Sequence, residues 1–142
     1  EFRRVLFRSR PLSPDHPDDE IIEGLLIVRP EGRLFFLNAQ IVADGIAALQ
    51  AQYHPHVLVL DMSRVPDIEF SALQMMIEYD KRASDHGLEA WLAGLNPDAL
   101  EMVRRSGLAE QLGTDRMLFN TRTAIERYKV RIARSGFEPT NP

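Results

Sequence analysis

The strongest constraint on the fold lies near the middle of the chain, where the apolar run at residues 57–60 (Val-Leu-Val-Leu) ends abruptly at Asp61. An unbroken run of valine and leucine is typical of a strand that is covered on both faces, as in a parallel sheet. Pro66 disfavours an early start of the next helix, and Ser71 with Gln74 has the spacing of a capping box. The segment therefore predicts a buried strand, an acidic loop and a serine-capped helix in direct succession.

A β-hairpin is predicted upstream of this segment. Residues 21–29 form the first strand, residues 30–32 (Pro-Glu-Gly) the turn, and residues 34–37 (Leu-Phe-Phe-Leu) the returning strand, because two short apolar runs around a glycine-containing turn are typical of a hairpin. Asn38 is placed to cap a helix that runs to about Tyr53. The apolar stripe of that helix has helical spacing and consists of Val42, Ile46, Leu49 and Tyr53.

The second half of the chain alternates helix and strand, with a capping residue or a glycine at most boundaries. The predicted elements are a helix from Ser71 to about Gly87, a strand at residues 88–95, a short helix capped by Asn96 and ending near Gly107, a brief edge strand at residues 117–119, and a last helix capped by Asn120 or Thr121. The order β-β-α-β-α-β-α-β-α predicts an α/β fold with a mixed, mostly parallel sheet of about five strands and about four helices.

The two ends of the chain differ in composition from the part between them. Residues 1–9 (Glu-Phe-Arg-Arg-Val-Leu-Phe-Arg-Ser) can be encoded by a restriction site followed by a common sequencing adapter, so we interpret them as a cloning or sequencing scar. A genuine basic segment beside a membrane is the alternative. Residues 10–19 are rich in proline and aspartate and predict a linker. Residues 20–134 form the predicted domain, and residues 135–142 are expected to be a disordered tail.

Composition and charge exclude several classes of function. The chain has 142 residues, the usual length of one domain. It has no cysteine, which excludes disulfides, thiol nucleophiles and cysteine-bound metals. Its net charge is -4, and without residues 1–9 the remaining 14 basic and 20 acidic residues give -6, so nucleic acid is not an expected partner. No apolar run approaches the roughly 18 residues of a membrane span, so this segment itself is expected to be soluble.

Candidate catalytic or metal-binding residues are few. Asp61, Asp67 and Glu69 come close together in the sequence, where they could form an acid/base pair or a magnesium site; a solvated acidic loop is the interpretation we prefer. His54 and His56 could supply two metal ligands, but no third ligand is near in the sequence, so a structural turn is favoured. Without a phosphate-binding glycine loop or a nucleophile motif, the sequence predicts no enzymatic activity and no cofactor.

Residues 69–72 (Glu-Phe-Ser-Ala) occupy the place of an Asp-Ser-Ser-Gly motif that opens the second helix of bacterial anti-sigma-factor antagonists, which are members of the STAS-domain family. In the antagonists the second serine of the motif is phosphorylated by the partner kinase. The resemblance therefore makes Ser71 the candidate regulatory phosphorylation site. Glu69 replaces the aspartate conservatively, whereas Phe70 and Ala72 depart from the motif.

Other segments resemble a second branch of the same family. Residues 24–32 (Gly-Leu-Leu-Ile-Val-Arg-Pro-Glu-Gly) and residues 34–39 (Leu-Phe-Phe-Leu-Asn-Ala), together with residues 92–97, 103–108 and 117–120, are similar to the cytoplasmic tails of bacterial SulP-type sulfate permeases. This resemblance covers residues 24–128. It implies a regulatory domain that follows the membrane part of a transporter for sulfate or a related anion, at the cytoplasmic face of the bacterial inner membrane. The alternative is a free-standing phospho-switch that sequesters an anti-sigma kinase.

The resemblance also implies how such a domain works. It would act without catalysis, by docking on its own transmembrane transport domain, on another STAS domain or on a cytoplasmic regulatory protein. Some STAS domains bind guanine nucleotides, which would lie at the carboxyl end of the third strand, but this chain lacks a phosphate-binding glycine loop. The residues of the expected interaction loop all follow the buried strand: Asp61, Ser63, Arg64, Asp67, Glu69 and Phe70.

Overall fold

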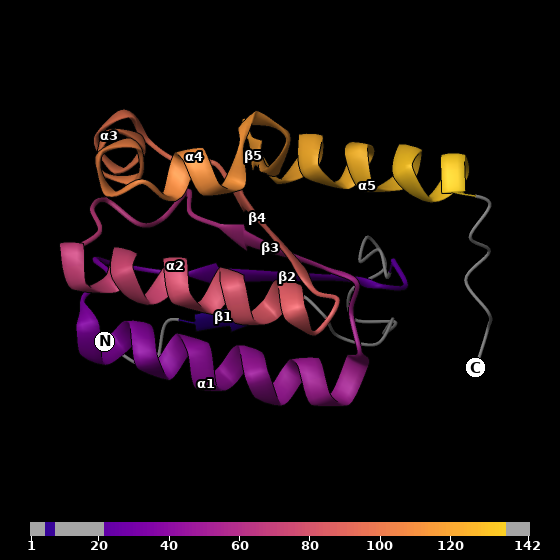
Figure 1. Cartoon of the computed structure of the whole chain (residues 1–142), viewed down its shortest axis with the longest axis horizontal. Coiled ribbons are helices and arrows are strands. Elements are labelled where there is room, and N and C mark those ends of the chain that lie inside the picture. Colours follow the sequence, from indigo (N-terminus) through magenta and orange to yellow (C-terminus); the bar gives the residue numbers. More distant parts are fainter. Residues whose placement is uncertain (1–4, 8–21, 136–142) are drawn as a thin grey trace, which may run out of the picture.

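The computed structural model describes residues 5–7 and 22–135. Its elements are, in chain order, β1 (Val5–Phe7), β2 (Leu25–Pro30), α1 (Phe36–Tyr53), β3 (Val57–Asp61), α2 (Phe70–Asp85), β4 (Glu89–Ala93), α3 (Pro97–Ser106), α4 (Leu108–Leu112), η2 (Thr114–Arg116), β5 (Met117–Leu118) and α5 (Thr121–Ser135) (Figure 1). The predicted α/β fold is confirmed, and the structure adds the short helix α4 after α3.

The five strands form one sheet in the order β1-β2-β3-β4-β5. Strands β2 to β5 are parallel, and β1 pairs antiparallel with β2. The predicted mixed, mostly parallel sheet is therefore confirmed, as is the edge position of the last strand. Because the carboxyl ends of parallel strands meet at one edge of a sheet, the loops that follow β2, β3 and β4 all begin there.

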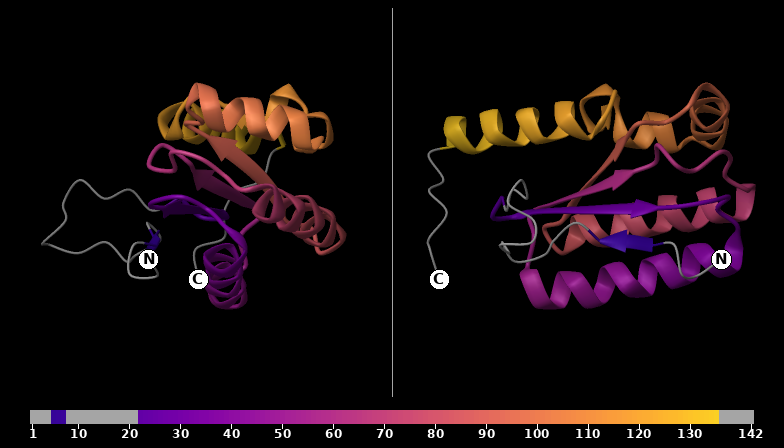
Figure 2. Two further views of the ribbon diagram at one scale, coloured as in Figure 1. Left: turned by 90° about the vertical axis from the view of Figure 1, so that its left-hand side faces the viewer. Right: turned by 180° about the vertical axis from the view of Figure 1, so that it is seen from behind.

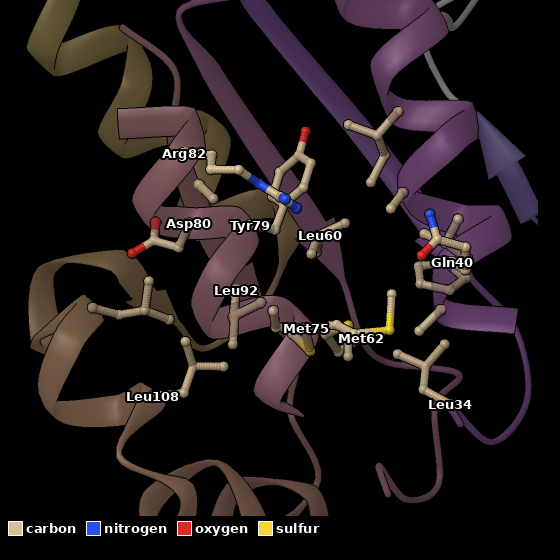
Figure 3. A pocket seen from close by; sticks show the side chains of 18 residues that line it. Leu34, Gln40, Leu60, Met62, Met75, Tyr79, Asp80, Arg82, Leu92 and Leu108 are labelled. Atoms are coloured by element: carbon tan, nitrogen blue, oxygen red, sulfur yellow. The ribbon is translucent and has the colours of Figure 1, made fainter. Parts of the chain in front are cut away.

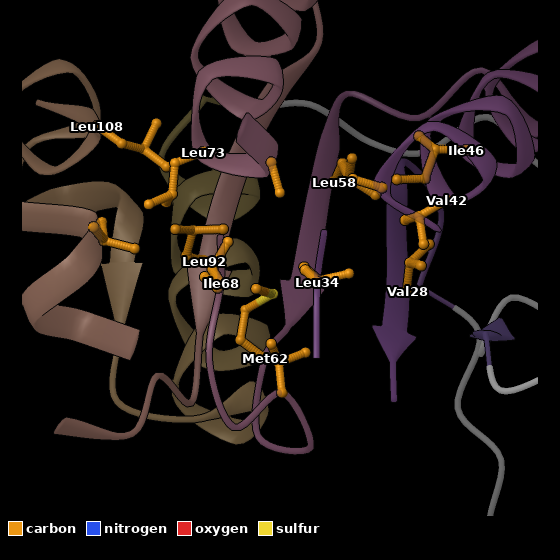
Figure 4. Close-up of a cluster of buried hydrophobic side chains, with 14 of the residues drawn as sticks. Val28, Leu34, Val42, Ile46, Leu58, Met62, Ile68, Leu73, Leu92 and Leu108 are labelled. Carbon is orange, nitrogen blue, oxygen red and sulfur yellow. The ribbon is translucent and has the colours of Figure 1, made fainter. Parts of the chain in front are cut away.

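Helices cover both faces of the sheet. Successive side chains of a strand point to opposite faces, so strands that are apolar throughout present apolar side chains on each face. On one face Leu26, Leu58 and Leu92 belong to the larger core cluster with side chains of α1 to α4, and on the other face Val59 and Trp91 pack with α5. Figure 4 shows the larger cluster between sheet and helices. The end-on view in Figure 2 places α5 on the opposite side of the sheet from α1 and α2.

Helix α5 is anchored to the start of β2 through a buried tyrosine. The Oη of Tyr128 donates a hydrogen bond to the carbonyl oxygen of Glu23 at 2.7 Å, and burial raises the pKa of this hydroxyl, so it remains a neutral donor. The neighbouring Gly24 has φ +83°, and a Cβ there would lie 2.3 Å from Tyr128 Oη. Only glycine fits this position. Ile125 and Ile132, also on α5, are half-buried.

The predicted hairpin is wrong. Residues 34–37 do not form a strand beside β2: Leu34 makes a single parallel bridge to Ile68, and the chain enters α1 at Phe36. Both edges of β2 are already taken, by β1 and by β3, so the aromatic run has no strand to pair with there. The antiparallel strand of the sheet is instead β1, which lies within the segment that we interpreted as a scar. That interpretation stays a prediction.

Asparagine side chains cap three helices. Asn96 Oδ1 accepts a hydrogen bond from the Ala99 N–H at 2.8 Å, which confirms the predicted cap of α3. The last helix is capped by the first of its two candidates, Asn120. Asn38 lies within the first turn of α1 rather than before it, because the helix begins earlier than predicted. It caps the helix from inside, with its Oδ1 accepting from the Phe35 N–H at 2.7 Å.

The apolar stripe of α1 ends earlier than predicted. Val42 and Ile46 are buried and Leu49 is half-buried, but Tyr53 is 44% exposed. It is the last residue of α1. Tyr53 is therefore a surface residue at the end of the molecule opposite to the start of α1 (Figure 1).

Candidate docking site

Residues 62–69 connect β3 to α2 at the carboxyl edge of the sheet, and we call them the β3–α2 loop. The loop does not stand alone, because it pairs with the connection between β2 and α1. Three backbone hydrogen bonds join the two segments: Gly32 N–H to Arg64 O (2.9 Å), Leu34 N–H to Asp67 O (3.1 Å) and Glu69 N–H to Leu34 O (2.8 Å). The loop is thus paired through its backbone with the neighbouring segment, as a short strand would be.

Ion pairs strengthen the same junction. Arg33 Nε lies 2.7 Å from Asp67 Oδ1, and Arg33 Nη2 lies 3.4 Å from Glu69 Oε1. Arg64 Nη1 lies 3.2 Å from Glu31 Oε1. Exposed pairs of this kind contribute about 0–1 kcal/mol each, so the backbone pairing carries most of the order. The acidic side chains of the loop are nevertheless matched by arginines, and the loop is less acidic than its sequence suggested.

Asn96 fixes the loop from its other side. Its Nδ2 donates to the carbonyl oxygens of Val65, at 3.0 Å, and Pro66, at 3.1 Å. The same side chain caps α3 through its Oδ1. One amide therefore ties the middle of the β3–α2 loop to the start of α3.

Asp61 supports the loop from within. Only 5% of this residue is exposed, and its Oδ1 accepts a hydrogen bond from the Ser63 N–H at 3.1 Å. Gly94, directly after β4, has φ +73°, and a Cβ there would lie 3.2 Å from the Ser63 Cβ, so the loop packs closely on the glycine backbone. Asp61 was predicted as part of the interaction loop, but its burial gives it a structural position, while Ser63 and Arg64 are exposed.

Ser71 is not the N-cap that the capping-box spacing predicted. Helix α2 begins at Phe70, with Glu69 as its N-cap and no side-chain cap hydrogen bond. The reason is the backbone pairing of Glu69 with Leu34, which keeps residue 69 extended and lets the helix start directly after it. Ser71 lies in the first turn of α2 and is half-buried.

Exposed apolar side chains gather where α1 and α2 begin. Phe36 is 53% exposed, Leu37 is 63% exposed and Phe70 is 63% exposed. Leu34 and Ile68 pair with each other, and each helix starts two residues later, so Phe36 and Phe70 occupy equivalent places on neighbouring helices. Figure 1 shows the two helices side by side, beginning at the same end. We call Phe36, Leu37 and Phe70 the apolar patch.

Within residues 22–135, no group of three or more His, Asp or Glu side chains is arranged to hold a metal ion. Asp67 and Glu69 share Arg33, and His54 is the C-cap residue of α1 with φ 49°.

None of the helices in the described part combines the length and hydropathy of a membrane span.

Several residues of the site were not predicted from the sequence. Arg33 and Glu31 lie more than 30 residues before their ion-pair partners, and the tether from Asn96 to the loop spans a similar distance. No local pattern could have found these contacts. Phe36 and Leu37 were assigned to a strand, so their exposure was missed as well.

Comparisons with known proteins agree with this fold and extend it. The family model described as "STAS domain" matches residues 16–127. Seven curated proteins that match the chain are all named as sulfate transporters or sulfate permeases. High affinity sulfate transporter 2 of Stylosanthes hamata is 27% identical over an alignment of 123 positions, and the match covers 80% of this chain and 19% of that protein. The chain thus spans about a fifth of the length of this relative.

Solved structures are similar in fold. A sulfate transporter family protein from Wolinella succinogenes has a TM-score of 0.72 and 24% identity, with 85% of this chain and 98% of that chain covered. The murine Slc26a9 anion transporter has a TM-score of 0.75 and 18% identity, with 92% of this chain and 23% of that chain covered. The anti-sigma factor antagonist SpoIIAA has a TM-score of 0.64 and 14% identity, with 78% and 93% covered. With the family model matching most of its length, the chain belongs to the STAS-domain family.

Proposed function

We propose that this chain is the non-catalytic regulatory domain of a SulP-type transporter for sulfate or a related inorganic anion. It works at the cytoplasmic face of the membrane by docking on its own transmembrane transport domain. Similarity to a sulfate transporter of which it covers only 19% supports the idea that a larger membrane part belongs with it. The fold alone does not separate this proposal from an anti-sigma-factor antagonist, but the curated relatives favour the transporter.

The apolar patch is the observation that carries the proposal. Two phenylalanines and a leucine stand exposed side by side at the carboxyl edge of the sheet. Contiguous exposed apolar side chains rimmed by charged groups are typical of protein interaction sites, and aromatic residues are enriched at the centres of interfaces. Arg33, Glu69 and Arg64 supply the charged rim.

A docking surface also needs a fixed shape. The β3–α2 loop is paired with residues 32–34 on one side and held by Asn96 on the other. Little conformational entropy would be lost when a partner binds such a surface, which favours affinity. To regulate transport, the partner must contact this surface differently in two states of the transport cycle.

Phosphorylation of Ser71 is the regulatory step that we propose for this surface. A phosphate there adds about -1.5 to -2 charge in the first turn of α2, where the helix N-terminus favours it. Glu69 lies two residues away and opposes it, while Arg33, in the connection between β2 and α1, lies 3.4 Å from Glu69 and supplies a positive charge beside it. The added charge would alter the rim of the apolar patch.

Photo-crosslinking tests the docking directly. A photoreactive phenylalanine analogue is placed at position 70 in the full-length transporter, and the crosslinked peptides are identified by mass spectrometry. The matched control carries the analogue at position 53, since Tyr53 is also an exposed aromatic residue but lies at the far end of α1, roughly 27 Å away along an 18-residue helix. We expect position 70 to crosslink to the transport domain and position 53 to give no such product.

Two results would contradict the proposal. Position 70 could crosslink only to other proteins or to a second copy of this domain, which would remove the transport domain as the partner. Positions 70 and 53 could crosslink to the transport domain equally well, which would mean that the apolar patch has no special part in the contact.

A further inference from the structure

A cavity lies between α1, α2 and the sheet. Its free volume is about 90 Å³; since a single water needs roughly 10–15 Å³ on this scale, several waters or a short alkyl chain would fit. The wall is mostly apolar and includes Val42 and Ile46 of α1, Met75 and Met76 of α2, and Met62 after β3 (Figure 3). Methionine side chains adapt their shape to a ligand more readily than branched ones.

One polar group in the cavity wall lacks a partner. The Oη of Tyr79 is buried and makes no hydrogen bond to any residue within the described ranges 5–7 and 22–135. A buried hydroxyl is unfavourable unless it donates a hydrogen bond to an acceptor. The unpaired Tyr79 hydroxyl is therefore a reason to look for a ligand. Burial also raises the pKa of Tyr79, and the charge of Arg82 acts in the opposite sense. The hydroxyl is therefore a donor at neutral pH.

Arg82 is a second donor at the same place. It lines the cavity, and Figure 3 shows its side chain extending toward Tyr79. Its guanidinium makes no hydrogen bond and no ion pair to any residue of the described part of the chain. The nearby carboxylate of Asp80 does not compensate it, because Asp80 is already bound by Gln111 at 2.7 Å and by Arg116 at 2.8 Å.

We propose that this cavity binds a small carboxylate with an alkyl chain. The chain lies among the methionine and aliphatic side chains, and the carboxylate accepts hydrogen bonds from Tyr79 Oη and from the Arg82 guanidinium. A carboxylate is an acceptor only, so it matches two donors without leaving a donor of its own unpaired. Apolar walls with a few convergent polar groups are typical of small-molecule sites. This inference does not depend on the docking function proposed above.

Titration of the purified chain with three eight-carbon ligands tests the inference. Octanoate, octan-1-ol and octylammonium share one chain length and differ in the head group, and their binding is followed by calorimetry below their micellar range. We expect saturable binding of octanoate, binding of octan-1-ol about tenfold weaker because the charge-assisted hydrogen bonds are lost, and no binding of octylammonium because its charge meets Arg82.

Three variants and one control separate the parts of the site. Tyr79→Phe and Arg82→Gln should each weaken octanoate about tenfold, and Ala43→Leu, which places a larger side chain in the cavity wall, should abolish binding of octanoate and octan-1-ol alike. Arg104→Gln is the control, since Arg104 is an exposed arginine on α3 that does not line the cavity. It should bind octanoate as the unmodified chain does.

The inference is overturned if octanoate does not bind the unmodified chain, if octylammonium binds as well as octanoate, or if Arg82→Gln binds octanoate unchanged. Arg82 is exposed, so its replacement leaves the core intact and this arm remains informative even if Tyr79→Phe fails to fold.

Discussion

At the scale of single residues, the part played by Ser71 follows from where α2 begins. The helix starts at Phe70, so the Ser71 hydroxyl is not needed as a cap, and its side chain makes no hydrogen bond to any residue that the structure describes. The half-buried Ser71 hydroxyl therefore leaves room for the phosphorylation that we propose. Its neighbour Phe70 is 63% exposed and is not part of the core either.

Replacing Ser71 separates structure from regulation. Ser71→Ala should change the free energy of unfolding of the chain by less than about 0.5 kcal/mol, because no cap and no hydrogen bond is lost. Ser71→Asp, which adds a negative charge beside Glu69, should change anion uptake by the full-length transporter, whereas Ser71→Ala should not. Chemical denaturation and radiolabelled sulfate uptake measure the two effects. A destabilisation of 1 kcal/mol or more by alanine would indicate a cap after all, and unchanged uptake in Ser71→Asp would argue against regulation at this residue.

At the scale of elements, the β3–α2 loop owes its order to its neighbours. It is paired with the start of α1 and held by the residue that caps α3. The surface proposed for docking is therefore a product of three elements whose sequences lie about 30 residues apart from one another. Asn96 is the simplest point at which to test this arrangement, because its two amide atoms have separate duties.

Two substitutions of Asn96 separate those duties. Asn96→Asp keeps an oxygen for the α3 cap but places a carboxylate against the carbonyl oxygens of Val65 and Pro66, so hydrogen exchange should accelerate in the β3–α2 loop. Asn96→Ala loses cap and tether and should destabilise the domain by about 1–2 kcal/mol. Asn120→Ala, which removes the cap of α5 and leaves both contacts of Asn96 in place, is the control. If loop exchange is the same in Asn96→Asp and Asn120→Ala, the tether does not order the loop.

Elements that depend on contacts between residues close in the sequence could be predicted. Elements that depend on contacts between residues far apart in the sequence could not. The run at residues 57–60 and the cap at Asn96 are local patterns, and both predictions are confirmed. The hairpin prediction was wrong because residues 34–37 have the local pattern of a strand. In the structure Leu34 bridges to Ile68, far away in the sequence, and the helix begins two residues later. The pairing of Asp80 with Arg116, 36 residues apart, has no local signal at all.

At the scale of the whole molecule, the two ends of the sheet have different character. The carboxyl edge carries the apolar patch, the ordered loop and Ser71, whereas the other end carries the close contact between Gly24 and Tyr128 that anchors α5. An adaptor that transmits the state of one domain to another needs one firm surface rather than a reactive centre. We propose that the apolar patch is this surface.

Sulfate uptake by the full-length transporter tests that claim most directly. Phe70→Ala removes the most exposed aromatic side chain of the apolar patch, and Tyr53→Ala removes an exposed aromatic residue at the opposite end of α1. We predict that Phe70→Ala changes the uptake rate roughly fivefold, as expected for an interface residue worth about 1 kcal/mol, at unchanged transporter abundance, and that Tyr53→Ala leaves it unchanged. Equal uptake by Phe70→Ala, Tyr53→Ala and the unmodified transporter would contradict the account.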